Sequence, residues 1–373
     1  SGSTNPAYWT QNIFEYIDDG VLSKGSHTIK FGGIAKRIRY NGFSAARYRG
    51  EYQFQNLQTF LQGIPTRYEA AFVFAGVRGL RQWLYGMYFQ DDWRVTPRLT
   101  LNLGLRYEFT TVPTEAFGRL ANLRGQYDKQ VVVGDPLWEN PSLKNFAPRI
   151  GFAYDPFGDG KTSIRGGGGI FYDQLLPLYY RDSPFRILPF QQRIFVTPQN
   201  LATALNVPQG TTVIPFPNAH TFYTPQQRLS DPAVQIDLMN YRPHQPYTTQ
   251  YNLTIQRQLV GDWSLMVGYL GSQSHNNSRN VNWNASLPTA IVNGDKCYSV
   301  PGSPCFNGTT VGVRNPNFAA ILQREFDANA NYNSLQLQTK KRFSHGYDLN
   351  MVYQFARTMD IQSGIGGSTD FTN

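Results

Sequence analysis

Apolar and polar residues alternate strictly along several segments of the chain. The clearest segment is residues 98–109, RLTLNLGLRYEF, where leucines and a tyrosine occupy one phase and polar residues or glycine the other. A period of two puts these sets on opposite faces of a β-strand, whereas a helix would scatter the leucines around its circumference. Because about ten residues suffice for a strand to cross a bilayer, the segment indicates a membrane-crossing strand.

The same alternation recurs along the whole chain, for example in residues 82–95, 149–154 and 348–356. Residues 56–63 break it and are expected to form a short helical or irregular periplasmic link. Under the even-strand rule of outer-membrane barrels, we count about twelve strands. The expected strands are residues 10–22, 26–40, 44–55, 67–76, 81–95, 98–112, 145–156, 161–174, 245–259, 262–274, 330–343 and 346–360.

Short and long connections alternate between these strands. The short ones are rich in turn-forming residues, whereas residues 111–144, 175–244 and 272–329 form long, irregular connections. Outer-membrane barrels combine tight periplasmic turns with long extracellular loops. The predicted fold class is therefore all-β: an antiparallel transmembrane β-barrel of outer-membrane type, with residues 1–373 forming part of one barrel domain.

The composition agrees with a barrel and disfavours other classes. No segment approaches the roughly 18 consecutive apolar residues of a membrane helix. Mean hydropathy is −0.42, as expected when apolar lipid-facing residues alternate with polar ones, and aromatic residues make up 14% of the chain. The net charge of +9 comes from dispersed Lys and Arg, so no nucleic-acid partner is expected.

One phase of two central strands is expected to face lipid, with aromatic rings at the membrane interfaces. Tyr and Trp suit that position because one part of the side chain is apolar and another is polar. The alternative is ordinary packing inside a soluble β-sandwich. The predicted lipid-facing and girdle residues are Trp83, Tyr85, Trp93, Leu101, Leu103, Leu105 and Tyr107.

The two cysteines, Cys297 and Cys305, are close together in a Pro- and Gly-rich segment. A disulfide that staples this loop is the favoured interpretation, and a metal site or free thiols are the alternatives. The five histidines show no ligand spacing, and no catalytic triad is indicated. We therefore expect no enzyme activity, no metal site and no cofactor.

Two further motifs suggest chemistry only superficially. The segment GDGKT, residues 158–162, lacks the Gly six positions before the Lys that a phosphate loop requires, so we predict a turn. Asp91 and Asp92 are adjacent in an expected strand, so their side chains point to opposite faces and do not form a catalytic pair.

Several segments resemble the barrel of TonB-dependent receptors. Residues 88–108, YFQDDWRVTPRLTLNLGLRYE, are similar to the general barrel pattern, and residues 145–174, NFAPRIGFAYDPFGDGKTSIRGGGGIFYDQ, resemble the Oar-like branch. Residues 24–33, 56–65 and 247–269 fit the same branch in the same order. The resemblance implies a barrel of about 22 strands in the whole protein, of which about half would be here.

The resemblance also implies a function in the outer membrane of a Gram-negative bacterium. The extracellular loops would bind a small solute, sugar or peptide, and the TonB complex would drive its import through a plug domain. This segment carries no plug, TonB box, signal peptide or terminal aromatic residue, so we expect an internal barrel fragment. Alternatives are a structural or adhesive surface barrel, a passive porin and a soluble binding protein.

Arg106, Arg149 and Arg165 lie on the polar phase of their strands and are expected to face the barrel lumen. There they would contact plug carboxylates or an anionic solute. The alternative is that each arginine is solvated or paired locally.

Overall fold

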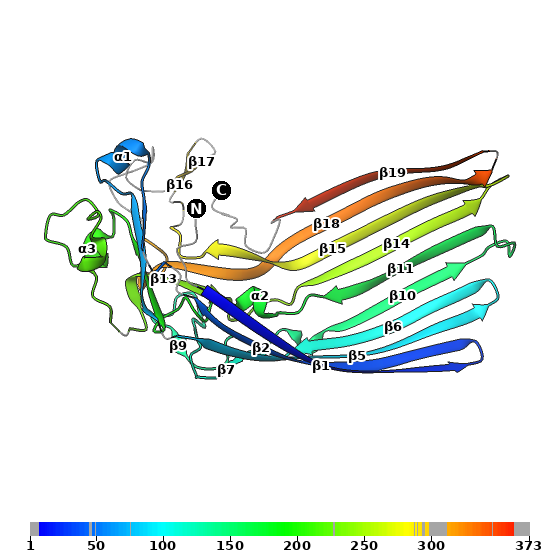
Figure 1. Cartoon of the computed structure of the whole chain (residues 1–373), viewed down its shortest axis with the longest axis horizontal. Coiled ribbons are helices and arrows are strands. Elements are labelled where there is room, and N and C mark those ends of the chain that lie inside the picture. Colours follow the sequence, from blue (N-terminus) through cyan, green and yellow to red (C-terminus); the bar gives the residue numbers. More distant parts are fainter. Residues whose placement is uncertain are drawn as a thin grey trace.

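A sheet of 15 strands forms the framework of the protein, and shorter elements are stacked on one end of it (Figure 1). The computed structural model describes residues 7–44, 47–48, 50–74, 76–226, 228–286, 288, 290–292, 295–297, 312–344 and 346–361. Among these residues, no helix has the length and apolar character needed to span a membrane.

The long antiparallel strands of this sheet form what we call the wall. Nine of them follow the path β1-β2-β5-β6-β10-β11-β14-β15-β18, and β19 pairs with β18 as a tenth. Within the described residues, β1 and β19 each have a single neighbour, so the wall is open. The wall strands are β1 (Ala7–Lys24), β2 (His27–Ser44), β5 (Arg78–Thr96), β6 (Leu99–Thr110), β10 (Phe146–Tyr154), β11 (Thr162–Tyr172), β14 (Tyr247–Gln258), β15 (Trp263–Asn282), β18 (Phe318–Ser344) and β19 (Tyr347–Asp360).

Short turns join the wall strands at the end opposite the stacked elements (Figure 1). Gly25 and Gly261 occupy two of these turns with φ of 59° and 71°, values that favour glycine because it has no Cβ. In a third turn, the Asp155 carboxylate accepts hydrogen bonds from the backbone N–H groups of Gly158 (2.9 Å) and Gly160 (3.0 Å). The GDGKT segment is therefore a turn leading into β11, which confirms the prediction.

Two of the twelve expected strands do not join the wall. β2 pairs directly with β5, from His27↔Trp93 to Gly42↔Arg78. Residues 44–55 contribute only the short β3 (Glu51–Gln53), and residues 67–76 form β4 (Arg67–Phe74), which pairs with β3 and with a distant segment. The linking segment forms helix α1 (Leu57–Leu61) at the end with the long connections, so its expected periplasmic position is wrong.

The long connections were expected to be irregular, but they fold into an ordered layer that we call the cap. The cap comprises β3, β4, α1, the first residues of β18 and the remaining short elements between the wall strands. β15 extends to Asn282 and β18 already starts at Phe318, so the third long connection is shorter than expected. The remaining elements are β7 (Thr114–Glu115), β8 (Ala121–Asn122), β9 (Val132–Val133), the 3-10 helix η1 (Ser142–Lys144), α2 (Pro177–Tyr180), β12 (Gln191–Val196), α3 (Leu201–Ala204), the 3-10 helix η2 (Ala219–Phe222), β13 (Asp231–Met239), β16 (Ala290–Val292) and β17 (Asp295–Cys297).

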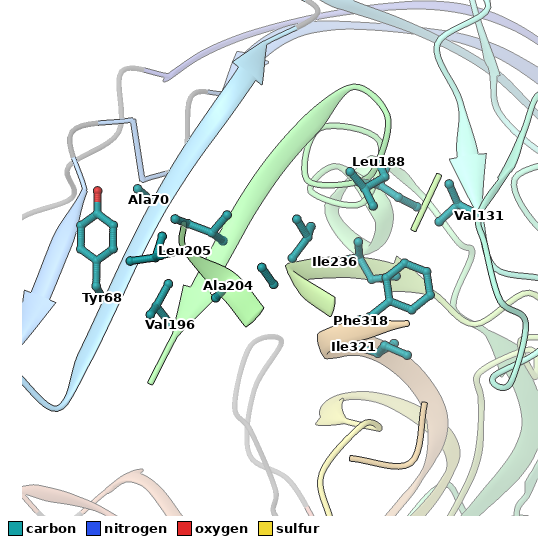
Figure 2. Packing of buried hydrophobic residues seen from close by; sticks show 14 of the residues in the cluster. Tyr68, Ala70, Val131, Leu188, Val196, Ala204, Leu205, Ile236, Phe318 and Ile321 are labelled. Carbon is teal, nitrogen blue, oxygen red and sulfur yellow. The ribbon is translucent and has the colours of Figure 1, made fainter. Parts of the chain in front are cut away.

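Two buried apolar clusters hold the cap together and fix it to the wall. The larger cluster lies within the cap, where α3, β12, β13 and β18 contribute buried side chains such as Val196, Ile236 and Phe318 (Figure 2). The smaller cluster joins Trp138 and Tyr180 of the cap to wall residues such as Leu80. The larger cluster gives the cap a core of its own. Burying one such side chain stabilises the fold by about 1.5–3 kcal/mol.

Candidate functional site

A buried network of ion pairs connects three strands of the cap. Glu69 of β4, which is 3% exposed, pairs with Arg47 (3.0 Å), Arg67 (3.2 Å) and Arg193 of β12 (2.9 Å). Arg193 continues to Asp237 of β13 at 3.5 Å. Charges without partners are very costly in a protein interior, so this network fixes how β4, β12 and β13 lie against each other.

The electrostatics of Glu69 show how strongly its partners act. Burial by itself would raise the pKa of this carboxyl group. The charge and hydrogen bond of Arg193, together with the charges of Arg67 and Arg47, outweigh burial and hold the pKa below its usual value. Glu69 is therefore an anion at neutral pH. This network was not predicted, because Arg193 and Asp237 come from residues 175–244, which were expected to be an irregular connection.

An aromatic groove of about 620 Å³ lies on the cap beside this network. Tyr48, Tyr52, Tyr68 and Phe72 contribute its aromatic lining, and His220 lies at the same groove. The rings of Tyr52 and Tyr68 are 4.5 Å apart. Aromatic faces of this kind stack on apolar faces of a ligand, while hydroxyl and imidazole groups offer hydrogen bonds.

Hydrogen bonds fix the orientation of Tyr52 in the lining of the groove. Its hydroxyl donates to the carbonyl of Pro217 (2.8 Å) and accepts from the backbone N–H of Ala219 (2.9 Å). Tyr48 is 59% exposed and His220 is also exposed, so both side chains are accessible from solvent. The groove thus has a fixed inner wall and an accessible rim.

The three arginines expected in the lumen all lie on the polar face of the wall, and each has a partner nearby. Arg106 pairs with Glu108 at 3.0 Å, and Arg165 donates to the hydroxyl of Ser163 at 3.1 Å. The guanidinium of Arg149 lies 4.4 Å from the ring centroid of Phe171. Arg106 and Arg149 share a shallow groove of about 420 Å³. That these residues line the lumen of a closed barrel stays a prediction.

Asp91 and Asp92 have different partners on the two faces of β5. The Asp91 carboxylate and Nδ1 of His27 form a hydrogen bond of 2.7 Å near the short turns. Asp92 accepts from Lys30 (2.8 Å) and Asn102 (2.6 Å) on the polar face. The two carboxylates therefore do not form a pair, as the strand geometry predicted.

Among the described residues, several side chains on the apolar phase of β5 and β6 are exposed. Leu103 and Leu105 are 37% and 48% exposed, and Leu101 is half-buried between neighbouring strands. A second layer of protein would have buried these leucines, as the β-sandwich alternative requires. Trp93 lies on the same face near the short turns, where its ring stacks on His27 at 5.3 Å.

An aromatic row crosses the same face at the end nearer the cap. Successive ring centroids are 4.7–5.6 Å apart, and Tyr107 also donates a hydrogen bond to the carbonyl of Leu143 at 3.0 Å. With Trp93 at the other end, the leucines lie between two aromatic zones, as at the two interfaces of a bilayer. The row consists of Trp83, Tyr85, Phe109, Tyr107 and Phe146.

The predicted disulfide between Cys297 and Cys305 lies outside the described residues. Cys297 is the last residue of β17, and its side chain belongs to that undescribed part. Within the described ranges, no group of three or more His, Cys, Asp or Glu side chains is arranged to hold a metal ion.

The family model for the "outer membrane beta barrel domain" matches residues 1–373. The protein belongs to the outer-membrane β-barrel family. This membership agrees with the exposed apolar face and the aromatic zones, and it makes the chain an integral outer-membrane barrel protein. The open wall described above is the part of that barrel that the described residues form.

Among curated relatives, the barrel protein is 30% identical over 109 residues to the TonB-dependent transporter Oar of Myxococcus xanthus. This alignment covers 29% of the chain and 8% of Oar. The resemblance to the Oar-like branch of TonB-dependent receptors is thereby confirmed, whereas the aligned part is a small fraction of that relative.

Similar solved structures include the outer-membrane transporter YddB from Escherichia coli, with 12% identity and a TM-score of 0.49. That alignment covers 94% of this chain and 34% of YddB. The alcaligin outer-membrane receptor FauA from Bordetella pertussis has 9% identity and a TM-score of 0.38, with 99% and 41% coverage. Both TM-scores lie below 0.5, so neither likeness bears on function.

Proposed function

We propose that the complete protein is an energy-coupled outer-membrane receptor that takes up a small solute. The aromatic groove of the cap would bind the solute from outside, and the TonB complex would drive its passage inward. The observation that carries this proposal is the groove itself, which lies in the layer formed by the long connections. The local similarity to a relative named as a TonB-dependent transporter supports the coupling to TonB.

The lining of the groove favours a sugar or a peptide as the solute. Tyr48, Tyr52 and Phe72 offer ring faces to the C–H face of a sugar or to apolar side chains. Polar contacts would come from hydroxyl groups and from His220 at the rim. Catalysis is no part of this proposal.

Uptake in cells that express the complete protein tests the proposal. The probes are a labelled oligosaccharide series and a labelled peptide series, supplied to cells with and without TonB. We expect members of one series to accumulate only when TonB is present. Accumulation that persists without TonB would instead indicate a passive porin. Surface binding without accumulation would indicate a structural or adhesive barrel.

Variants in the groove connect uptake to the cap. Tyr48→Ala and His220→Ala should each weaken binding of the accumulated probe, by about two- to tenfold for the aromatic substitution. Tyr127→Ala is the matched control, because this tyrosine is 70% exposed in the cap and contacts Trp283 edge-on, and neither residue lines the groove. Equal effects of all three substitutions would contradict the assignment of the groove as the binding site.

A further inference from the structure

Three arginines gather on the lipid-facing phase of the wall, just beyond the aromatic row. Arg39 of β2 lies directly opposite Arg81 of β5, and Arg37 lies opposite Trp83. The guanidinium of Arg37 is 5.0 Å from the ring centroid of Trp83. We call Arg37, Arg39 and Arg81 the basic cluster.

The neighbours of these arginines show which way they point. Tyr40 and Leu80, adjacent in sequence to Arg39 and Arg81, are buried in the cluster that joins wall and cap. Successive side chains of a strand point to opposite faces, so the basic cluster faces away from the cap interior. Arg39 is exposed, and Arg37 and Arg81 are half-buried. The cluster therefore lies on the outside of the barrel, on the same side as Leu103 and Leu105.

The height of the cluster along the strands follows from spacing. Arg81 is two residues beyond Trp83 on the side of the cap, which is about 7 Å along the strand. Aromatic rows of barrels mark the level where hydrocarbon meets the polar headgroups. Because the cap is made of the long connections, this level belongs to the outer leaflet. The basic cluster is thus placed among the headgroups of that leaflet.

Among the described residues, no carboxylate forms an ion pair with the basic cluster, and Glu115 acts on Arg81 only at longer range. Directly opposed like charges on neighbouring strands are destabilising. Within the described part of the chain, none of the three guanidinium groups forms an ion pair, and Arg81 instead donates to the side chain of Asn41 at 2.9 Å. The carboxylate of the nearby Glu115 already accepts from the backbone N–H groups of Gly79, Phe117 and Arg119. An external anion would relieve the repulsion.

We propose that the basic cluster binds the phosphate groups of a phosphorylated glycolipid in the outer leaflet. Guanidinium groups bind phosphate with two parallel hydrogen bonds, and three of them match a glycolipid with more than one phosphate. The acyl chains of the same molecule would lie on the exposed leucines and the aromatic row below. This proposal depends on the outer-membrane location and not on solute import.

Binding of purified lipid A to the complete protein in mild detergent tests the proposal. The probes are lipid A with two phosphates, dephosphorylated lipid A, and inorganic phosphate as a competitor. Each arginine near a charged lipid surface contributes about 1 kcal/mol, so the triple variant R37Q/R39Q/R81Q should bind lipid A about a hundredfold more weakly. The corresponding triple lysine variant keeps the charges and should retain most of the affinity.

Controls separate the cluster from general charge effects and from misfolding. The variant R94Q/R342Q removes two exposed arginines near the short turns and should bind lipid A as the wild type does. R39Q changes the most exposed member alone, so folding is preserved, and it should weaken binding about fivefold. Unchanged binding by both arginine-to-glutamine variants of the cluster would overturn the proposal. Equal affinity for dephosphorylated lipid A, or displacement by inorganic phosphate at equal concentration, would overturn it as well.

Discussion

Replacing Glu69 by glutamine should open the cap while leaving the wall intact. The substitution keeps the size of a side chain that is 3% exposed but removes the charge that Arg47, Arg67 and Arg193 share. Breaking a buried ion pair costs about 3–5 kcal/mol. We expect the lower end of that range, because Arg193 keeps Asp237 at 3.5 Å and Arg47 keeps Glu51.

Hydrogen exchange of the complete protein in detergent measures this effect locally. A loss of about 3 kcal/mol in the cap corresponds to about a hundredfold faster exchange of protected amides in β4, β12 and β13. The wall strands β6 and β10 should exchange as in the wild type. Glu139→Gln is the matched control, because Glu139 and its partner Arg242 are 53% and 76% exposed and such surface pairs contribute about 0–1 kcal/mol. Equal exchange in the two variants would refute the structural role of the network.

Three other changes test the remaining features. Acid should loosen the cap, because the pKa of Glu69 is lowered in the folded protein. The contribution of the Glu69 carboxylate to the stability of the cap is present above the unfolded pKa and is lost as the pH falls through the folded pKa. Hydrogen exchange measured between neutral and acidic pH will detect this loss. Phe318→Ala, at a side chain that is 0% exposed, should destabilise the cap by about 3–5 kcal/mol, visible as faster proteolysis of the cap than of the wall. Leu105→Arg should destabilise the membrane-inserted barrel by about 2–4 kcal/mol, as measured by urea titration in lipid vesicles. Asn102→Arg on the polar face should have a much smaller effect. The reverse order of the two effects would mean that the faces are assigned wrongly.

The wall could be predicted from the sequence because each strand carries its own signal. Leu101, Leu103 and Leu105 alternate with polar residues, since one face meets lipid and the other meets polar groups. Strands whose two faces differ in this way can be recognised without knowledge of their partners. Their hairpin order follows from the short turns between them.

The cap could not be predicted because its strands are short and pair with segments far away in the sequence. In β13, Val234, Ile236 and Leu238 alternate with Gln235 and Asp237, but the run is short and lies inside residues 175–244, which were expected to be an irregular connection. Both faces of β13 are buried from Ala233 to Met239, so its polar residues do not mark a face open to solvent or lipid. Its pairing is also non-local: β13 runs parallel to β18, and β12 pairs with β4 across Arg193↔Ala71. The buried charges of Glu69 and Asp237 depend on partners that only this pairing brings together.

The long strand β18 passes through two environments, the cap core and the membrane-facing wall. Its first residues, including Phe318 and Ile321, are buried in the cap core, and Leu335 and Leu337 are exposed on the membrane face further along. A slip of one residue against β15 would turn both leucines to the opposite face. The same slip would move Phe318 out of its position in the cap core. An incorrectly aligned wall would therefore also lose the packing of the cap core. Assembly of the cap is thus a check on the alignment of the strands beneath.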